Sequence, residues 1–132
     1  MSKSNYLEDA ILDHILGDGT FSQPATVYVS LHSADPGDTG ASELSGNGYA
    51  RVAVTNNATN WPNASGGVKS NGAAITFPAA TGSDWATATH FGIWDASSAG
   101  NPLFFGALAD SKTVEVGDIA SFATGEIDIT ET

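Results

Sequence analysis

The chain of 132 residues contains no cysteine, few basic side chains and no long hydrophobic run. Without cysteine, disulfides and thiolate metal sites are excluded, so stability must come from packing or from assembly. A membrane-spanning helix needs about 20 consecutive apolar residues, and the sequence has no such run. The N-terminus also lacks the basic segment followed by an apolar one that marks a signal peptide. We therefore expect a chain made and kept in a cytosol-like compartment, with no membrane as partner.

Positively charged residues are scarce in the sequence. Four basic residues stand against fifteen acidic ones, which gives a net charge of −11. Binding to a nucleic-acid backbone needs clustered Lys and Arg that replace counterions. The basic residues are instead scattered along the chain, at Lys3, Arg51, Lys69 and Lys112. The composition therefore argues against nucleic acid as a partner, and the acidity helps to keep a small domain soluble.

The sequence also lacks a recognisable catalytic or metal-binding arrangement. It has no nucleophile elbow of the form Gly-x-Ser-x-Gly and no closely paired zinc ligands. His32 and His90 fall in predicted strands beside apolar residues, where hydrogen-bonded structural histidines are expected. His14 falls in the last turn of a predicted helix, where it caps or packs. We therefore expect no enzyme activity, no catalytic residue, no metal and no cofactor.

One helix is predicted, at the N-terminus. Ser4 or Asn5 can cap it, and Gly17 and Gly19 can end it because glycine accepts the left-handed cap conformation. The residues at i, i+3, i+4 and i+7 spacing on its apolar face are Leu7, Ala10, Ile11, His14 and Ile15. This face either packs on its own domain or docks on a neighbouring subunit. Residues 1–19 are thus assigned to the helix and its cap.

The remainder of the chain is predicted to be β. Apolar and polar residues alternate in short segments separated by Gly, Asn, Ser, Pro and Asp clusters, the pattern of a β-sandwich or jelly roll. The candidate strands are 26–32, 50–56, 73–77, 87–95, 103–109, 112–116 and 125–130. No composition break divides the chain. We therefore predict a mainly β fold in one domain, 1–132, with the β-sandwich over 24–130.

A long turn joins the first two predicted strands. Proline fixes φ and glycine accepts positive φ, so the segment after His32 leaves the strand at a defined point. The residues that shape this loop are Asp35, Pro36, Gly37, Asp38, Gly40, Tyr49 and Arg51. Its oxygen-rich turn has some likeness to a calcium loop, but it lacks the alternating carboxylates and the closing Glu of an EF-hand. A loop built for shape is more typical of a binding protein than of an enzyme.

Aromatic and apolar residues supply the candidates for contact with another subunit. These are Tyr6, Leu7, Ile11, Trp61, Trp85, Phe104 and Phe105. Phe104 and Phe105 point to opposite faces of one strand, so one ring must be covered by the helix, by a second sheet or by a neighbour. Trp61 and Trp85 fall in polar loops, where a ring anchors the loop, joins an interface or stacks on a sugar.

Three segments together carry a family resemblance. They are the opening Asn5–Glu8 and Leu12–His14, the run from Tyr28 to Arg51, and Thr89–Ala96. They resemble a family of small bacteriophage virion proteins, often labelled tail-fibre proteins, some of which are similar to cement or decoration proteins of the capsid exterior. The likeness extends to the closing segment, 122–130. It implies no catalytic residues and a place in the virion, after assembly in the bacterial host cytoplasm.

We therefore interpret the chain as a non-enzymatic structural component of a phage particle. The preferred hypothesis is a cement or decoration protein that sits over junctions between major capsid proteins, as a homo-oligomer such as a trimer. The alternative is a tail-fibre or baseplate protein that recognises the host surface. A third hypothesis, a hydrolase acting on host glycans, lacks a convincing pair of acids.

Copy number separates the first two hypotheses. A cement protein is expected to appear in hundreds of copies per virion and a fibre protein in few, which densitometry of purified virions measures. A copy number near that of a tail-tip component would instead contradict the capsid hypothesis.

Overall fold

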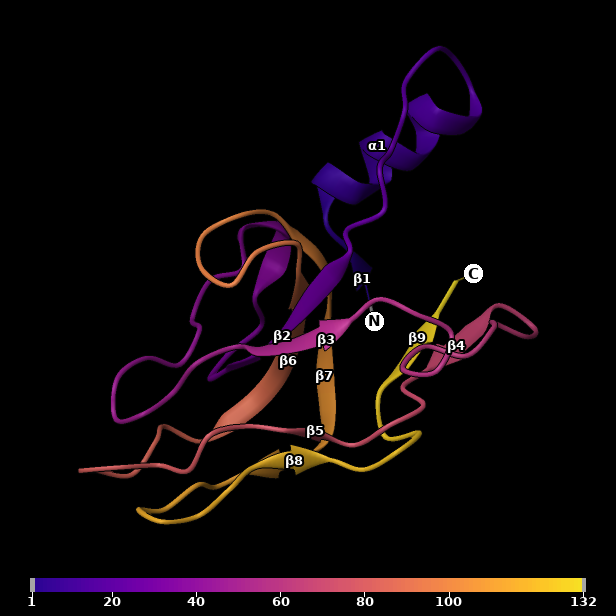
Figure 1. The fold of residues 1–132 in the computed structure, drawn as a ribbon. Helices are drawn as coiled ribbons and strands as arrows, with labels where there is room; N and C mark the ends of the chain where they lie inside the picture. Colours follow the sequence, from indigo (N-terminus) through magenta and orange to yellow (C-terminus); the bar gives the residue numbers. More distant parts are fainter. Residues whose placement is uncertain (1, 132) are drawn as a thin grey trace.

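The largest element of the fold is a five-stranded antiparallel sheet in the order β1-β7-β6-β2-β3, seen in the computed structural model of Figure 1, which describes residues 2–131. Its strands are β1 (Ser2–Lys3), β7 (Pro102–Lys112), β6 (Ala88–Trp94), β2 (Thr26–His32) and β3 (Val52–Thr55). The central pairs β2–β6 and β6–β7 form the longest ladders, with irregular register near both ends of β6.

Two small antiparallel pairs complete the β structure. One joins β4 (Val68–Ser70) to β9 (Asp128–Thr130), and the other joins β5 (Ile75–Thr76) to β8 (Ser121–Phe122). Phe122 of β8 lies with its ring centre 6.2 Å from that of Phe77 and 6.3 Å from that of Phe91 on β6. The β5–β8 pair thus packs on the large sheet through aromatic side chains, and together they enclose the core.

Strand β2 is buried on both faces. Val27, Val29 and Leu31 belong to the hydrophobic core, as their alternation in the sequence predicts. The opposite face carries Ser30 and His32, which are also fully buried. A loop must therefore cover this second face, and the loop that follows β2 does so.

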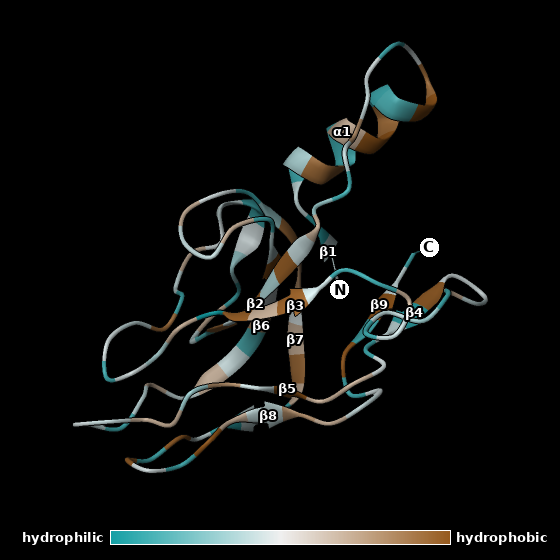
Figure 2. Cartoon of the chain, viewed as in Figure 1, coloured by the Kyte–Doolittle hydropathy of each residue, from teal (hydrophilic) through white to brown (hydrophobic). Residues whose placement is uncertain are grey.

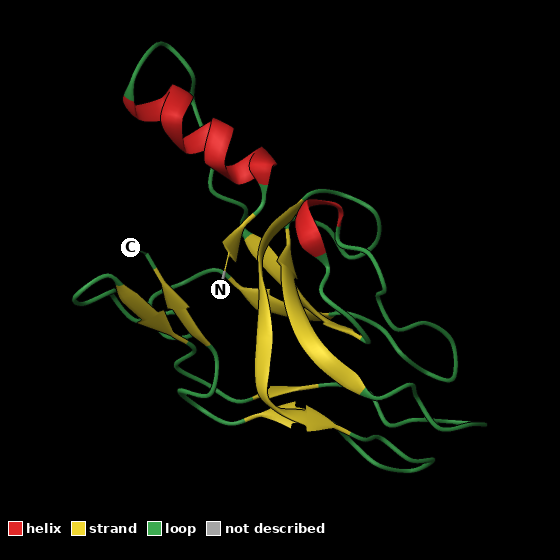
Figure 3. Ribbon diagram, turned by 180° about the vertical axis from the view of Figure 1, so that it is seen from behind, coloured by secondary structure: helices red, strands yellow, loops and turns green. Residues whose placement is uncertain are grey.

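Helix α1 (Asn5–Ile15) stands away from the sheets (Figure 3). Ser4 is its N-cap, and the hydroxyl oxygen of Ser4 accepts a hydrogen bond from the Leu7 N–H at 3.3 Å. Leu7 is the one residue of the helix that is fully buried. The helix is therefore anchored by its first turn, and its later turns project from the molecule.

The predicted mainly β fold with an N-terminal helix is confirmed, with differences at several strands. The predicted strand 112–116 is wrong, because β7 continues to Lys112 and residues 113–116 then form a loop. The predicted strands 50–56, 73–77 and 125–130 shorten to β3, β5 and β9. Strands β1, β4 and β8 were not predicted, since two or three residues are too few to show alternation. Within residues 2–131, no helix has the length and apolar character needed to cross a membrane.

The aromatic contact between the sheets yields a stability prediction. Replacement Phe122→Ala removes a ring that is 2% exposed and that contacts Phe77 and Phe91. The free energy of unfolding is expected to fall by about 3–5 kcal/mol, measured by urea denaturation. The neighbouring exposed residue provides the control, since Ser121→Ala is expected to change the value by less than about 0.5 kcal/mol. Equal effects of the two changes would contradict this account of the core.

Candidate functional site

The loop after β2 folds back along that strand. The Ser33 N–H donates to the Ser42 carbonyl at 3.0 Å, and the Leu44 N–H donates to the Leu31 carbonyl at 3.0 Å. The 3-10 turn η1 (Gly37–Thr39) lies between these contacts. It is followed by Gly40, at φ 70°, where a Cβ atom would collide with the ring of Trp94. The loop of residues 33–50, called here the covering loop, is therefore held against the sheet with no room for a larger residue at its closest point.

Arg51 is the central residue of the contacts that hold this loop. Its guanidinium donates two hydrogen bonds to the carboxylate of Glu43, from Nε at 2.9 Å and from the terminal nitrogen at 2.8 Å. The other terminal nitrogen donates to the carbonyls of Ala96 and Ala99, at 2.8 and 2.9 Å. The guanidinium also lies 3.7 Å from the ring centre of Trp94. Arg51 thereby joins the covering loop to the loop that follows β6.

Tyr49 adds a second contact to the same carboxylate. Its hydroxyl donates to Oε2 of Glu43 at 2.8 Å and accepts from the Leu31 N–H at 3.1 Å. Burial raises the pKa of Tyr49, so the hydroxyl keeps its proton. Burial acts to raise the pKa of Glu43 as well, but the hydrogen bonds from Arg51 and Tyr49 outweigh it and hold that pKa below its usual value. The group is therefore a stable ion pair rather than a proton-transfer site.

His32 lies under the covering loop and is hydrogen-bonded at both ring nitrogens. Its Nδ1 is 2.7 Å from the Ala41 carbonyl, which can only accept, so we assign the proton to Nδ1. Its Nε2 then accepts from the Ser30 hydroxyl at 2.7 Å, and that hydroxyl accepts from Nε1 of Trp94 at 2.8 Å. The imidazole and the Trp94 ring are stacked, with centroids 6.4 Å apart.

The hydrogen bond between the Ser30 hydroxyl and the His32 imidazole resembles the serine–histidine pair of a nucleophilic site. Unlike such a site, the pair cannot be reached from solvent. Both side chains are 0% exposed, so no substrate reaches the hydroxyl. The hydroxyl is also already engaged by Trp94. Nδ1 of His90, the other strand histidine, lies 2.8 Å from the hydroxyl oxygen of Thr89. Within residues 2–131, no group of three or more His, Cys, Asp or Glu side chains is arranged to hold a metal ion.

The covering loop also reaches the N-terminal helix. The side chain of Asp38 accepts a hydrogen bond from the backbone N–H of Asn5, the first residue of α1, at 3.1 Å. A carboxylate at this end of a helix is favoured by the helix dipole. Asp35 stays within its own turn and accepts from the Gly37 N–H at 3.0 Å. The loop therefore helps to orient α1.

After α1 the chain turns and runs back along the helix, and residues 5–24 form a projecting unit that we call the finger (Figure 1). The Gly19 N–H donates to the Asp13 carbonyl at 3.1 Å, and the Phe21 N–H donates to Nδ1 of His14 at 3.3 Å. Towards the end of the finger, Leu12, Ile15 and Leu16 are 58%, 70% and 75% exposed. Figure 2 shows hydrophobic and hydrophilic segments alternating along the projecting helix.

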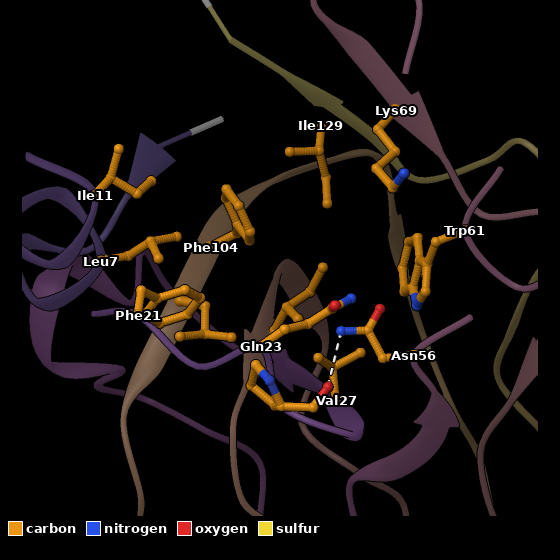
Figure 4. Close-up of a pocket in the computed structure, with 13 residues that line it drawn as sticks. Leu7, Ile11, Phe21, Gln23, Val27, Asn56, Trp61, Lys69, Phe104 and Ile129 are labelled. Carbon is orange, nitrogen blue, oxygen red and sulfur yellow. Dashed lines mark hydrogen bonds between the residues drawn. The ribbon is translucent and has the colours of Figure 1, made fainter. Parts of the chain in front are cut away.

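A mostly apolar cavity of about 250 Å³ lies where the finger meets the sheets, and we call it the base pocket (Figure 4). The finger contributes Leu7, Ile11 and Phe21, and the body contributes residues from the large sheet, from the 56–69 region and from β9. The body residues are Val27, Asn56, Trp61, Lys69, Ile93, Leu103, Phe104 and Ile129, with Gln23 and Pro24 at the junction. The pocket holds no acid pair or metal-ligand set.

The structure separates the residues that the sequence suggested for an interface. Tyr6 is exposed, Ile11, Phe104 and Phe105 are partly buried, and Leu7 is buried. Trp61 and Trp85 are each only 6% exposed and belong to the core. Nε1 of Trp85 donates to the Asn47 carbonyl at 2.8 Å, so this ring anchors a loop.

Sequence reasoning did not place Leu12 and Leu16 among the interface candidates, although they are 58% and 75% exposed. Their separation by four residues, with Ile15 between them, was the available signal. It also missed Glu43, whose role depends on Arg51 and Tyr49 meeting it in space. The predicted shaping residues Asp38, Gly40, Tyr49 and Arg51 all take part in the contacts described above.

The buried histidine yields a pH prediction. Burial lowers the pKa of His32 below its ordinary value of 6.5, so between these two values the folded chain binds fewer protons than the unfolded chain. The stabilisation is therefore complete above pH 6.5 and decreases as the pH falls through the folded pKa. Urea denaturation from about pH 7.5 to about pH 5.5 is expected to show this decrease.

One variant identifies the group responsible. His32→Gln is expected to flatten the dependence in that range. The lowered pKa of Glu43 acts at lower pH, below its ordinary value of 4.5, so its loss of stabilisation is separate. An unchanged slope in the His32 variant would show that another group titrates.

Comparison with known proteins adds a family to this geometry. The family model described as Podophage GP4 fiber I protein gp80 matches residues 2–130. No curated protein matches the chain. The family description names a fibre, so it supports the tail-fibre alternative better than the preferred hypothesis of a capsid cement protein. The chain therefore belongs to the podophage GP4 fiber I protein gp80 family and is a non-enzymatic structural protein of the phage fibre, a component of the virion.

Proposed function

We propose that this fibre protein is joined to neighbouring virion proteins through its finger and presents the opposite end of the molecule to the host surface. The observation that carries the proposal is the difference between the two ends. One end is a projecting helix with exposed Leu12, Ile15 and Leu16. The other end consists of two loops, residues 79–87 and 113–120, which we call the loop end and which lie far from α1 in Figure 1.

The finger has the properties of an assembly element. Three exposed aliphatic side chains lie close together in sequence at the end of the helix, and burial of each is worth about 1.5–3 kcal/mol. The helix is anchored by Leu7, Ser4 and Asp38, so its direction relative to the sheets is defined. A partner that covers this surface gains apolar burial without having to order the helix first.

The loop end has the properties of a preorganised recognition surface. The Trp85 N–H donates to the Val114 carbonyl at 2.9 Å, and the Gly117 N–H donates to the Ala80 carbonyl at 2.8 Å. The side chain of Asp84 accepts from the Val116 N–H at 2.9 Å. These bonds cross-link the two loops, and binding residues are commonly placed on loops held by a rigid scaffold.

Two apolar side chains of the loop end are exposed, Val116 at 54% and Ile119 at 59%. The single aromatic ring of the loop end, that of Trp85, is buried. Stacking of sugars on tryptophan at this end is therefore not supported. Recognition here would use backbone groups, short polar side chains and these two aliphatic residues.

A complementation experiment tests both halves of the proposal. Phage that lack this gene are grown in cells that supply a variant. The change Leu12→Ser, Ile15→Ser, Leu16→Ser is expected to give folded protein that is depleted from purified particles by at least about tenfold, since the apolar contact is lost. The change Val116→Asp, Ile119→Asp is expected to leave incorporation intact and to lower the adsorption rate by about tenfold.

Ala58→Asp is the matched control, because Ala58 is exposed and lies outside both the finger and the loop end. Circular dichroism of each purified variant verifies that it is folded. Normal incorporation of the finger variant would refute attachment through the finger. Adsorption of the loop-end variant at the rate of the Ala58→Asp control would refute a host-facing role for that end.

A further inference from the structure

The end of the finger, which we call the finger tip, combines apolar side chains with free acceptors. Leu12, Ile15 and Leu16 are exposed there. The carbonyls of His14 and Ile15 lie at the end of the helix and accept no backbone hydrogen bond from the described residues. Helix C-termini carry partial negative charge, and Asp13 and Asp18 add full charges nearby. The finger tip thus offers aliphatic groups surrounded by acceptors and negative charge.

The base pocket has the opposite properties. Its wall is aliphatic and aromatic, and Nε1 of Trp61, a ring 6% exposed, has no hydrogen-bond partner in the described chain. Lys69 also lines the pocket, where its ammonium group donates to the Pro62 carbonyl at 3.0 Å. Lys69 is therefore the one charged residue among those that line this mostly apolar pocket.

The base pocket is large enough to receive the apolar side chains of the finger tip. A cavity of about 150 Å³ lined by apolar side chains holds a benzene molecule, and the base pocket measures about 250 Å³. It thus has room for more than one aliphatic side chain of the kind found on the finger tip. The lining residue Gln23 is exposed, and Ile11, Phe21 and Phe104 are partly exposed, so the wall is accessible from outside.

The finger of the same chain cannot fill this pocket. The first turn of α1 forms part of the wall, and the helix of 11 residues rises about 1.5 Å per residue away from it. Figure 3 shows the C-terminal end of the helix directed away from the sheets. The tip and the pocket of one chain therefore remain apart, and a second molecule is needed to bring such surfaces together.

We infer that the finger tip of one copy of this protein inserts into the base pocket of a neighbouring copy. Ile15 and Leu16 enter the apolar cavity, and Lys69 faces the acids of the tip. The contact joins two different surfaces, so it repeats reciprocally between two copies or around a ring. This inference rests on the proposed role of the finger in assembly, and it identifies the partner as a second copy of the chain.

A contact between two finger tips is the competing arrangement. It would bring Asp13 and Asp18 of both copies together, and the finger contains no Lys or Arg to compensate them. Charge therefore favours the contact between tip and pocket.

Light scattering coupled to size-exclusion chromatography tests the inference on the purified full chain, at about 100 μM protein and about 0.15 M salt. The unmodified chain is expected to elute as an oligomer. The tip variant Ile15→Asp, Leu16→Asp and the pocket variants Gln23→Trp and Lys69→Glu are each expected to have the monomer mass. Ala58→Asp is expected to retain the oligomer mass.

A mixture of variants gives the decisive result. The tip variant keeps an intact pocket and the pocket variant keeps an intact tip, so their equimolar mixture is expected to form a 1:1 heterodimer. A monomeric unmodified chain, pocket variants that remain oligomeric, or a mixture without heterodimer would each overturn the inference. If the unmodified chain is monomeric while the finger variant is still lost from particles, this inference fails and attachment through the finger stands.

Discussion

The fourfold hydrogen bonding of Arg51 is the constraint on which the form of the molecule depends. One guanidinium holds the Glu43 carboxylate and two carbonyls of the loop after β6, and it lies over the Trp94 ring. A planar group with five donors can do this, whereas a lysine cannot replace its geometry. With a side chain only 5% exposed, the charge is stabilised because every neighbour is a matched acceptor. Two loops distant in sequence are thereby fixed to one sheet.

The position of the finger follows from the covering loop. Because Glu43 and Tyr49 hold one part of the loop and Gly40 fits against Trp94, the turn that carries Asp38 has a defined place. Asp38 then binds the first N–H of α1. On the other side of the helix start, the Ser4 N–H donates to the Leu103 carbonyl at 2.9 Å and ties the chain to β7. A short helix with one buried residue is thus oriented by contacts at its base.

The sequence was a good guide where structure depends on local chemistry. The alternation in β2, the capping residue Ser4 and the turn residues of the covering loop were all identifiable, because strand periodicity, caps and turns involve neighbours along the chain. It was a poor guide where partners are distant. The Ser30–Trp94 bond spans 64 residues, and the polar loop around Trp61 gave no sign that the fold would bury its ring. Strands of two or three residues were equally invisible, since their pairing is decided by tertiary contacts.

Each of the four basic side chains is already engaged within its own chain. Lys3 pairs with Glu131, Arg51 with Glu43 and Lys112 with Glu126, while Lys69 binds a carbonyl. The remaining carboxylates therefore give the outside of the protein a nearly unrelieved negative field. Towards any anionic surface, such a fibre has no long-range attraction, and dissolved salt must screen the approach before short-range contacts form. Its selectivity must then lie in close fit at the point of contact, and nonspecific adhesion to polyanions is suppressed by the same field.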